Sequence, residues 1–186
     1  DALYVGGDYF NIGGASRIFL SKLALNGGVD IGWANSSIGG IGVTALATDG
    51  ASLYVARDGI AGSTMRIDQY PTGGSGAPSP NWSIQVDAPP RTLSASGSMI
   101  TIGGEFDRAA AQLRAGVARV DAAALLQPEL SAELPGVVYA FAQQSDGGVL
   151  VGGWFRRAGT QVRRSLLKLT STGELDPSWQ MGVDGV

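Results

Sequence analysis

The sequence predicts an all-β protein made of four tandem copies of one unit of about fifty residues. Two observations carry this prediction: a short apolar motif returns at a nearly constant interval, and 29 glycines are spread along the 186 residues. Because glycine and proline punctuate short strands with tight turns, this composition favours many strands and no long helix. We expect a single repeat region over residues 1–186, with units of approximately 3–52, 53–99, 100–148 and 149–186.

The recurring motif is an apolar residue, any residue, a second apolar residue and a Gly-Gly pair. It occurs at residues 3–7, 100–104 and 149–153, and residues 53–57 are a degraded copy in which Ala56-Arg57 replaces the glycines. The four starts are separated by 50, 47 and 49 residues. Glycine at the end of a buried strand lets neighbouring chains approach closely, so the motif predicts crowded strands rather than a phosphate-binding loop.

Each unit is predicted to hold four short antiparallel strands. A first strand, such as 43–47 or 138–142, precedes an Asp-Gly turn, and the second strand ends in the glycine motif. A third strand alternates apolar and polar residues, and a fourth short segment surrounds a recurring tryptophan. The third strands are expected at 19–25, 65–70, 116–121 and 166–170. Four antiparallel strands at a period of about 49 residues are typical of a β-propeller blade.

The tryptophans keep the same interval as the glycine motif. Trp33, Trp82 and Trp179 occupy one position of the unit, and Leu130 fills the slot in the third copy. We expect these side chains to pack between blades, with a sugar-stacking platform as the alternative. Trp154 breaks the pattern, because it follows a Gly-Gly pair where other copies have Asp8 or Glu105. It is therefore the better candidate for an exposed ligand contact.

Three arginines, Arg17, Arg114 and Arg163, also recur at equivalent positions. Guanidinium groups could clamp an acidic glycan or a carboxylate. The favoured interpretation is structural: each arginine pairs with a turn carbonyl or a carboxylate of the next blade. Carboxylates available for such pairing are Asp8, Asp30 and Glu105. Lys22, Arg119 and Lys168 repeat at the same spacings.

The composition excludes several kinds of function. Cysteine and histidine are both absent, which removes thiolate and imidazole metal sites, disulfides and the Ser-His-Asp triad. No D-x-D-x-D loop suggests calcium, and no carboxylate pair suggests glycoside hydrolysis. We therefore predict no cofactor, no metal and no catalytic residue. A net charge of -3 disfavours nucleic acid, and no apolar run is long enough for membrane insertion.

Two segments resemble the delta-60 repeat of bacterial proteins. The first runs from Gly6-Gly7-Asp8-Tyr9-Phe10 through Arg17 to Trp33, and the second runs from Gly152-Gly153-Trp154-Phe155 through Arg163 to Trp179. The second copy also resembles a kelch blade, in Tyr70-Pro71, Trp82 and the later Ile102-Gly103-Gly104. Both resemblances imply a β-propeller. The delta-60 resemblance further implies a large secreted or cell-surface protein, without implying an activity.

The expected function is a non-enzymatic structural or interaction module, extracellular or at the cell surface, that binds protein or glycan through blade loops. The alternatives are a carbohydrate-binding propeller and the propeller domain of a polysaccharide-acting enzyme. Residues 185–186 align with 136–137, and no first strand precedes Leu3, so further repeats or self-association are expected to complete a larger propeller. The degraded second copy is expected to expose the loop 73–80.

Overall fold

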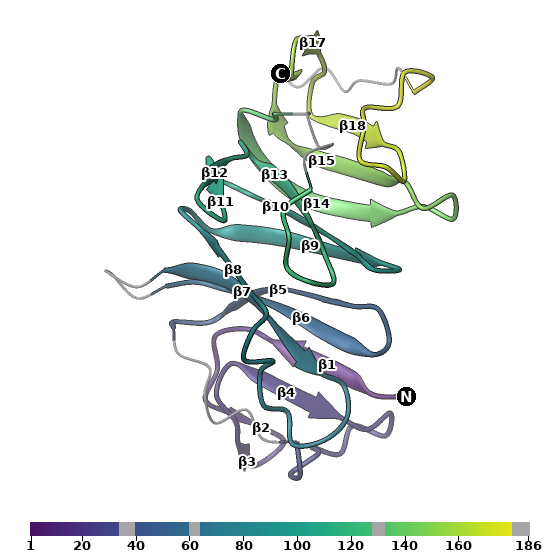
Figure 1. The fold of residues 1–186 in the computed structure, drawn as a ribbon. Helices are drawn as coiled ribbons and strands as arrows, with labels where there is room; N and C mark the ends of the chain where they lie inside the picture. The colour runs from purple at the N-terminus through teal and green to yellow at the C-terminus, as the bar shows by residue number, and fades with distance from the viewer. Residues whose placement is uncertain (34–39, 60–63, 128–132, 180–186) are drawn as a thin grey trace.

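The computed structural model describes residues 1–33, 40–59, 64–127 and 133–179. Every regular element among these residues is a strand, so the prediction of an all-β chain is confirmed. The sheets follow one another along the molecule, from the N-terminal unit at one end to the C-terminal unit at the other (Figure 1). Sheets from neighbouring units lie against each other, and the core is divided among these contacts.

Three kinds of strand recur as the sequence predicts. The second strand of each unit is central and pairs antiparallel with the third, and with the first where a first strand is present. First strands are β5 (Val43–Thr48), β9 (Pro90–Ser96) and β14 (Gly136–Gln143). Second strands are β1 (Leu3–Gly6), β6 (Ser52–Arg57), β10 (Met99–Gly104) and β15 (Val149–Phe155). Third strands are β4 (Leu20–Leu23), β7 (Met65–Pro71), β13 (Val117–Asp121) and β18 (Leu166–Leu169).

The fourth strand is described in one unit, the second, as β8 (Ser83–Val86), which pairs with β7. It directly follows Trp82, and the segments that follow the equivalent position in the other units, 34–37, 131–134 and 180–183, lie wholly or partly outside the described residues. Ahead of that position each of these units makes one isolated bridge to its third strand, Leu23↔Val29, Val120↔Leu126 or Leu169↔Leu175. In the first unit Asp30 Oδ1 accepts hydrogen bonds from the Gly32 and Trp33 backbone amides, which forms a turn ahead of the tryptophan.

A short hairpin, which the sequence analysis missed, joins the second and third strands in three units. These hairpins are β2 (Asn11–Ile12) with β3 (Ala15–Ser16), β11 (Arg108–Ala109) with β12 (Gln112–Leu113), and β16 (Arg157–Ala158) with β17 (Gln161–Val162). The hairpin β11–β12 also pairs with β8 of the preceding unit through Ala109↔Val86, which extends that sheet to six strands. The hairpin β11–β12 therefore links two units, whereas β2–β3 and β16–β17 form separate two-stranded sheets.

First strands of successive units lie side by side and are joined by side chains. Thr44 Oγ1 donates to the Pro90 carbonyl at 2.6 Å, and Ser94 Oγ donates to Gln143 Oε1 at 2.6 Å. The glycine motif makes this approach possible. A Cβ atom on Gly103 would lie 2.6 Å from a methyl carbon of Val138 in β14, the first strand of the next sheet, closer than real Cβ contacts allow. The interpretation of the glycines as sites of close approach is confirmed at Gly6, Gly103, Gly104 and Gly153, whereas Gly7 and Gly152 have room for a Cβ atom.

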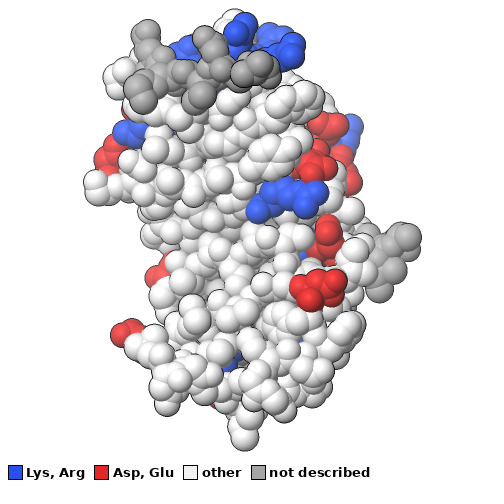
Figure 2. Space-filling model, turned by 180° about the vertical axis from the view of Figure 1, so that it is seen from behind, with Lys and Arg blue, Asp and Glu red and all other residues white. Residues whose placement is uncertain are grey.

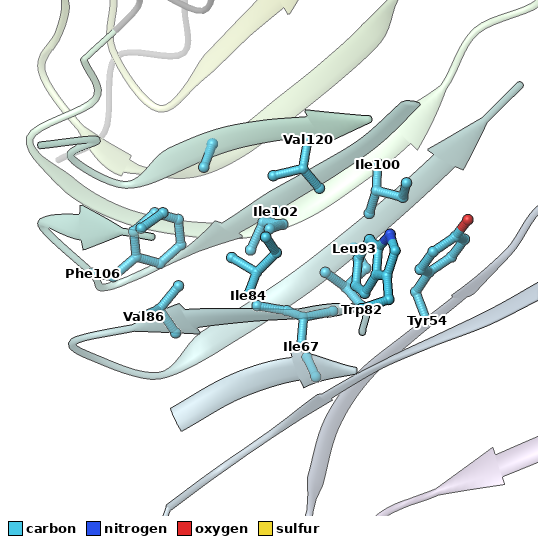
Figure 3. Packing of buried hydrophobic residues seen from close by; sticks show 13 residues of the cluster. Tyr54, Ile67, Trp82, Ile84, Val86, Leu93, Ile100, Ile102, Phe106 and Val120 are labelled. Atoms are coloured by element: carbon cyan, nitrogen blue, oxygen red, sulfur yellow. The ribbon is translucent and has the colours of Figure 1, made fainter. Parts of the chain in front are cut away.

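The recurring tryptophans occupy the core between neighbouring sheets. Trp33 is 1% exposed and Trp82 is 5% exposed, so both are buried as predicted. Figure 3 shows Trp82 beside Tyr54, with side chains of β6, β7 and β8 facing those of β9, β10 and β13. Trp179 is only half-buried, and Leu130 lies outside the described residues.

The degraded second copy contains a buried ion pair where other copies have small residues. Arg57 replaces the second glycine of the motif, and its Nε donates to Asp68 Oδ2 at 2.8 Å. Both residues are buried, and Arg66 Nε also contacts Asp68 Oδ2 at 3.0 Å from a more exposed position. The loss of Gly-Gly in this copy thus accompanies a charged core contact.

The loop 73–80 follows β7, and most of it is exposed, as expected. The exception is Gly76, which is buried, because its backbone lies against the indole of Trp33 in the first unit. A Cβ atom there would approach the indole to 2.7 Å, and its φ of +69° also favours glycine. The loop therefore covers an interface as well as facing solvent.

Candidate functional site

The predicted ligand contacts lie where the second strands end and the hairpins begin, which we call the hairpin edge. Arg17, Arg114 and Arg163 directly follow β3, β12 and β17, and Trp154 is the next-to-last residue of β15. The three arginines therefore occupy separate hairpins. Only Arg163 shares a unit with Trp154.

The three arginines adopt one local geometry. In each, Nη1 donates to the carbonyl of the preceding residue, at 2.9 Å for Arg17, 2.7 Å for Arg114 and 3.0 Å for Arg163. Within the described part of the chain, each Nε is buried without a hydrogen-bond partner. Burying a hydrogen-bond donor without a partner is unfavourable. The same unfavourable arrangement occurs in all three units.

The expected pairing of each arginine with the next blade is wrong, as the hydrogen bonds of their guanidinium groups show. Their guanidinium groups bond to carbonyls of their own units, because each side chain folds back onto its own hairpin, and Arg17 Nη2 also donates to the Ile31 carbonyl at 3.0 Å. Two of the proposed carboxylate partners are engaged elsewhere. Glu105 pairs with Arg91 at 2.7 Å, and Asp30 lies 3.6 Å from Lys22.

The residue opposite each arginine distinguishes the three hairpins. The backbone amides of Arg17, Arg114 and Arg163 donate to the carbonyls of Phe10, Asp107 and Arg156, at 3.0, 2.8 and 3.2 Å respectively. The backbone is thus the same, while the facing side chain is aromatic, acidic or basic. Equivalent positions have therefore acquired different surface chemistry.

Trp154 is 66% exposed and lies beside the basic hairpin of the fourth unit. The next residue, Phe155, is 2% exposed, and Arg156 beyond it is exposed again. Trp154 and Arg156 therefore flank a buried side chain, and both face away from the core. The sequence analysis singled out Trp154 and Arg163 but missed Arg156. The adjacent arginines at 156–157 and 163–164 were the feature of the sequence that could have identified it.

The hairpin β16–β17 concentrates positive charge in an acidic chain. Four arginines lie between residues 156 and 164, and that segment contains no carboxylate. Figure 2 shows basic side chains gathered at this end of the molecule, while acidic side chains predominate along the edge of the other units. The fourth unit therefore offers the most distinctive charged surface on the hairpin edge.

The opposite edge of the sheets carries two polar grooves between neighbouring units. One has a volume of about 660 Å³ and is lined by Tyr4, Lys22 and Thr72, among others, and one of about 390 Å³ is lined by Arg119 and Gln127. Tyr4 Oη and Lys22 Nζ both donate to the Thr72 carbonyl, at 3.1 and 2.9 Å. The polar groups of the larger groove thus bond across the interface, which gives them a structural role.

The repeated lysine of the fourth unit forms an ion-pair network. Lys168 Nζ donates to Asp146 Oδ2 and lies 3.5 Å from Asp176 Oδ2. The hydrogen bond between Lys168 and Asp146 lowers the pKa of the carboxyl and raises the pKa of the ammonium. Both pKa values move away from neutrality, whereas acid–base catalysis near pH 7 requires the opposite.

Within residues 1–33, 40–59, 64–127 and 133–179, no group of three or more carboxylates is arranged to hold a metal ion. The structure also contains no helix, among those residues, that is long and apolar enough to cross a membrane.

The fourth unit is also where a known family matches the chain. Residues 144–178 match the model of a family described as a domain of unknown function (DUF5122), beta-propeller. This match and the helix-free structure support an all-β, propeller-type fold. The matched segment includes Trp154 and the whole β16–β17 hairpin. No curated protein and no solved structure shows a significant match.

Proposed function

We propose that the four units are blades of a β-propeller of the delta-60 type and form part of a larger ring. Successive units repeat the same contacts between first strands, and two successive interfaces each bury a tryptophan from the equivalent position. Propellers place equivalent strands of successive blades around one axis, which accounts for both repetitions. Further repeats or a second copy of the chain would supply the remaining blades.

We further propose that the chain is a non-enzymatic interaction module that binds glycan or protein through its hairpins, outside the cell or at its surface. The observation that carries this proposal is the difference in facing side chains, Phe10, Asp107 and Arg156, on hairpins with the same backbone. If the hairpins had only a structural role, nothing would require the side chains at these three positions to differ in charge and polarity. Exposed side chains on a rigid scaffold are where binding residues concentrate.

A carbohydrate-binding propeller is the second candidate within this proposal. Trp154 favours it, because an exposed indole can stack on a sugar ring and no other described tryptophan is as exposed. An enzyme acting on polysaccharide would need an acid and a base that converge from different blades.

A glycan array combined with an activity assay tests this proposal. We expect the purified chain to bind a subset of glycans, or a protein ligand, without cleaving either. Release of reducing ends from a bound polysaccharide would contradict the non-enzymatic role. Binding that survives substitution of every exposed hairpin residue would contradict the hairpins as the binding surface.

A further inference from the structure

The fourth hairpin places two basic residues directly opposite each other in its backbone register. The amide of Arg163 donates to the carbonyl of Arg156, so these residues face each other across the antiparallel pair. Side chains that are directly opposite in such a pair lie on the same side and close together, and like charges there are unfavourable. The equivalent pair in the third unit, Asp107 and Arg114, has opposite charges. A bound anion between Arg156 and Arg163 would convert the repulsion into two attractions.

An aromatic surface adjoins this pair of arginines. Trp154 and Arg156 are two residues apart, and in extended chain that spacing is about 7 Å, comparable with the width of one sugar ring. A ligand with a negative group attached to a ring could therefore meet both the guanidinium pair and the indole.

We propose that Trp154, Arg156 and Arg163 form a binding site for an acidic polysaccharide. A sugar carboxylate or sulfate lies between the two guanidinium groups, and the ring stacks on the indole of Trp154. Arg156 suits this role because it is exposed and its planar fork can bind a carboxylate through two parallel hydrogen bonds, while Arg163, whose Nη1 donates to the Val162 carbonyl, contributes its positive charge. This inference rests on the proposed glycan-binding function and specifies its ligand class and its blade.

The charge distribution favours a polysaccharide over nucleic acid. Single-stranded nucleic acid is held by a basic groove that follows the backbone over about four or more nucleotides. Here four arginines are confined to one hairpin, and the third hairpin mixes both signs, with Glu105 and Asp107 beside Arg108 and Arg114. A sugar chain can engage the fourth hairpin through one acidic residue, whereas a nucleic acid backbone would find no continuous basic groove beyond it.

The test is titration calorimetry with acidic probes and matched controls. The probes are oligogalacturonate, hyaluronan fragments and a sulfated heparin fragment, and the comparison ligands are neutral dextran oligomers and single-stranded DNA. We expect at least one acidic probe to bind, with affinity falling as salt rises, and neutral dextran to bind at least tenfold more weakly. Failure of all three acidic probes to bind, or tighter binding of DNA, would overturn the proposal.

Variants locate the site. Arg156→Asp recreates the charge pair of the third unit, so it should weaken binding at least tenfold without lowering the melting temperature. Trp154→Ala should also weaken binding, and Arg114→Gln, at the equivalent position of the third unit, should leave it unchanged. The reciprocal substitution Asp107→Arg should add a weak second site. Unchanged binding by Arg156→Asp would remove the site from this hairpin.

The two proposals can fail separately. Binding of a neutral glycan or a protein through another hairpin would retain the interaction module and refute the acidic-sugar site. Absence of any binding to glycan or protein would refute both.

Discussion

Replacing Trp33 by alanine should destabilise the protein more than any exposed tryptophan change. The indole is 1% exposed and packs against the rings of Tyr4 at 5.5 Å and Tyr70 at 6.4 Å between centroids. Gly76 closes over it, so three segments from two units surround the space that alanine would leave empty. Because these walls belong to different sheets, little collapse is possible, and we expect a loss of about 3 to 5 kcal/mol.

Urea unfolding followed by circular dichroism measures this loss, with Trp154→Ala as the matched control. Trp154 is 66% exposed, so its substitution should change the free energy of unfolding by less than about 0.5 kcal/mol. Iodide should quench the fluorescence of Trp154 and leave that of Trp33 almost unaffected. A loss below about 1 kcal/mol for Trp33→Ala, or equal losses for the two variants, would refute the claim that the indole fills the interface.

Three further predictions concern stability. Gly103→Ala should cost about 1 to 3 kcal/mol by overpacking, whereas Gly73→Ala, with open space around it, should be nearly neutral in the same urea assay; equal effects would contradict the close-approach argument. Burial raises the pKa of Tyr70 to about 12, so stability present below pH 10 should be lost as pH rises from 10 to about 12, by about 3 kcal/mol, and Tyr70→Phe should remove this alkaline loss. Arg57→Met should cost about 3 kcal/mol because Asp68 stays buried with only the more exposed Arg66 as a charged partner, and the double change Arg57→Met with Asp68→Leu should recover most of it; a double variant as unstable as the single one would show that the ion pair itself stabilises the fold.

The sequence predicted the elements whose residues repeat with a clear period. The second and third strands were located because the glycine motif and alternation persist over four or more residues, as in β10 and β13. Burial of Trp33 and Trp82 followed from their recurrence at one position. These features depend on backbone pattern and apolar volume, which sequence spacing records directly.

The hairpins and the arginine contacts were not predicted, for a different physical reason. A two-residue strand such as β16 is too short to show alternation, and two residues of the third hairpin, Ala110 and Ala111, adopt positive φ angles without glycine. The partner of Arg114 depends on its rotamer, which folds the side chain back to the Leu113 carbonyl. Spacing along the chain therefore revealed that the arginines are equivalent but not what they contact.

The loop that covers Trp33 has a consequence for synthesis on the ribosome. Trp33 leaves the peptidyl transferase centre about forty residues before Gly76, the residue that covers its indole. At elongation rates of about 5 to 20 residues per second, the indole lacks its cover for roughly 2 to 8 seconds. The first unit therefore emerges with its largest apolar side chain exposed, and it can complete its core only when the following unit has been made. Nascent chains that stall within this interval should be the ones most prone to capture by chaperones.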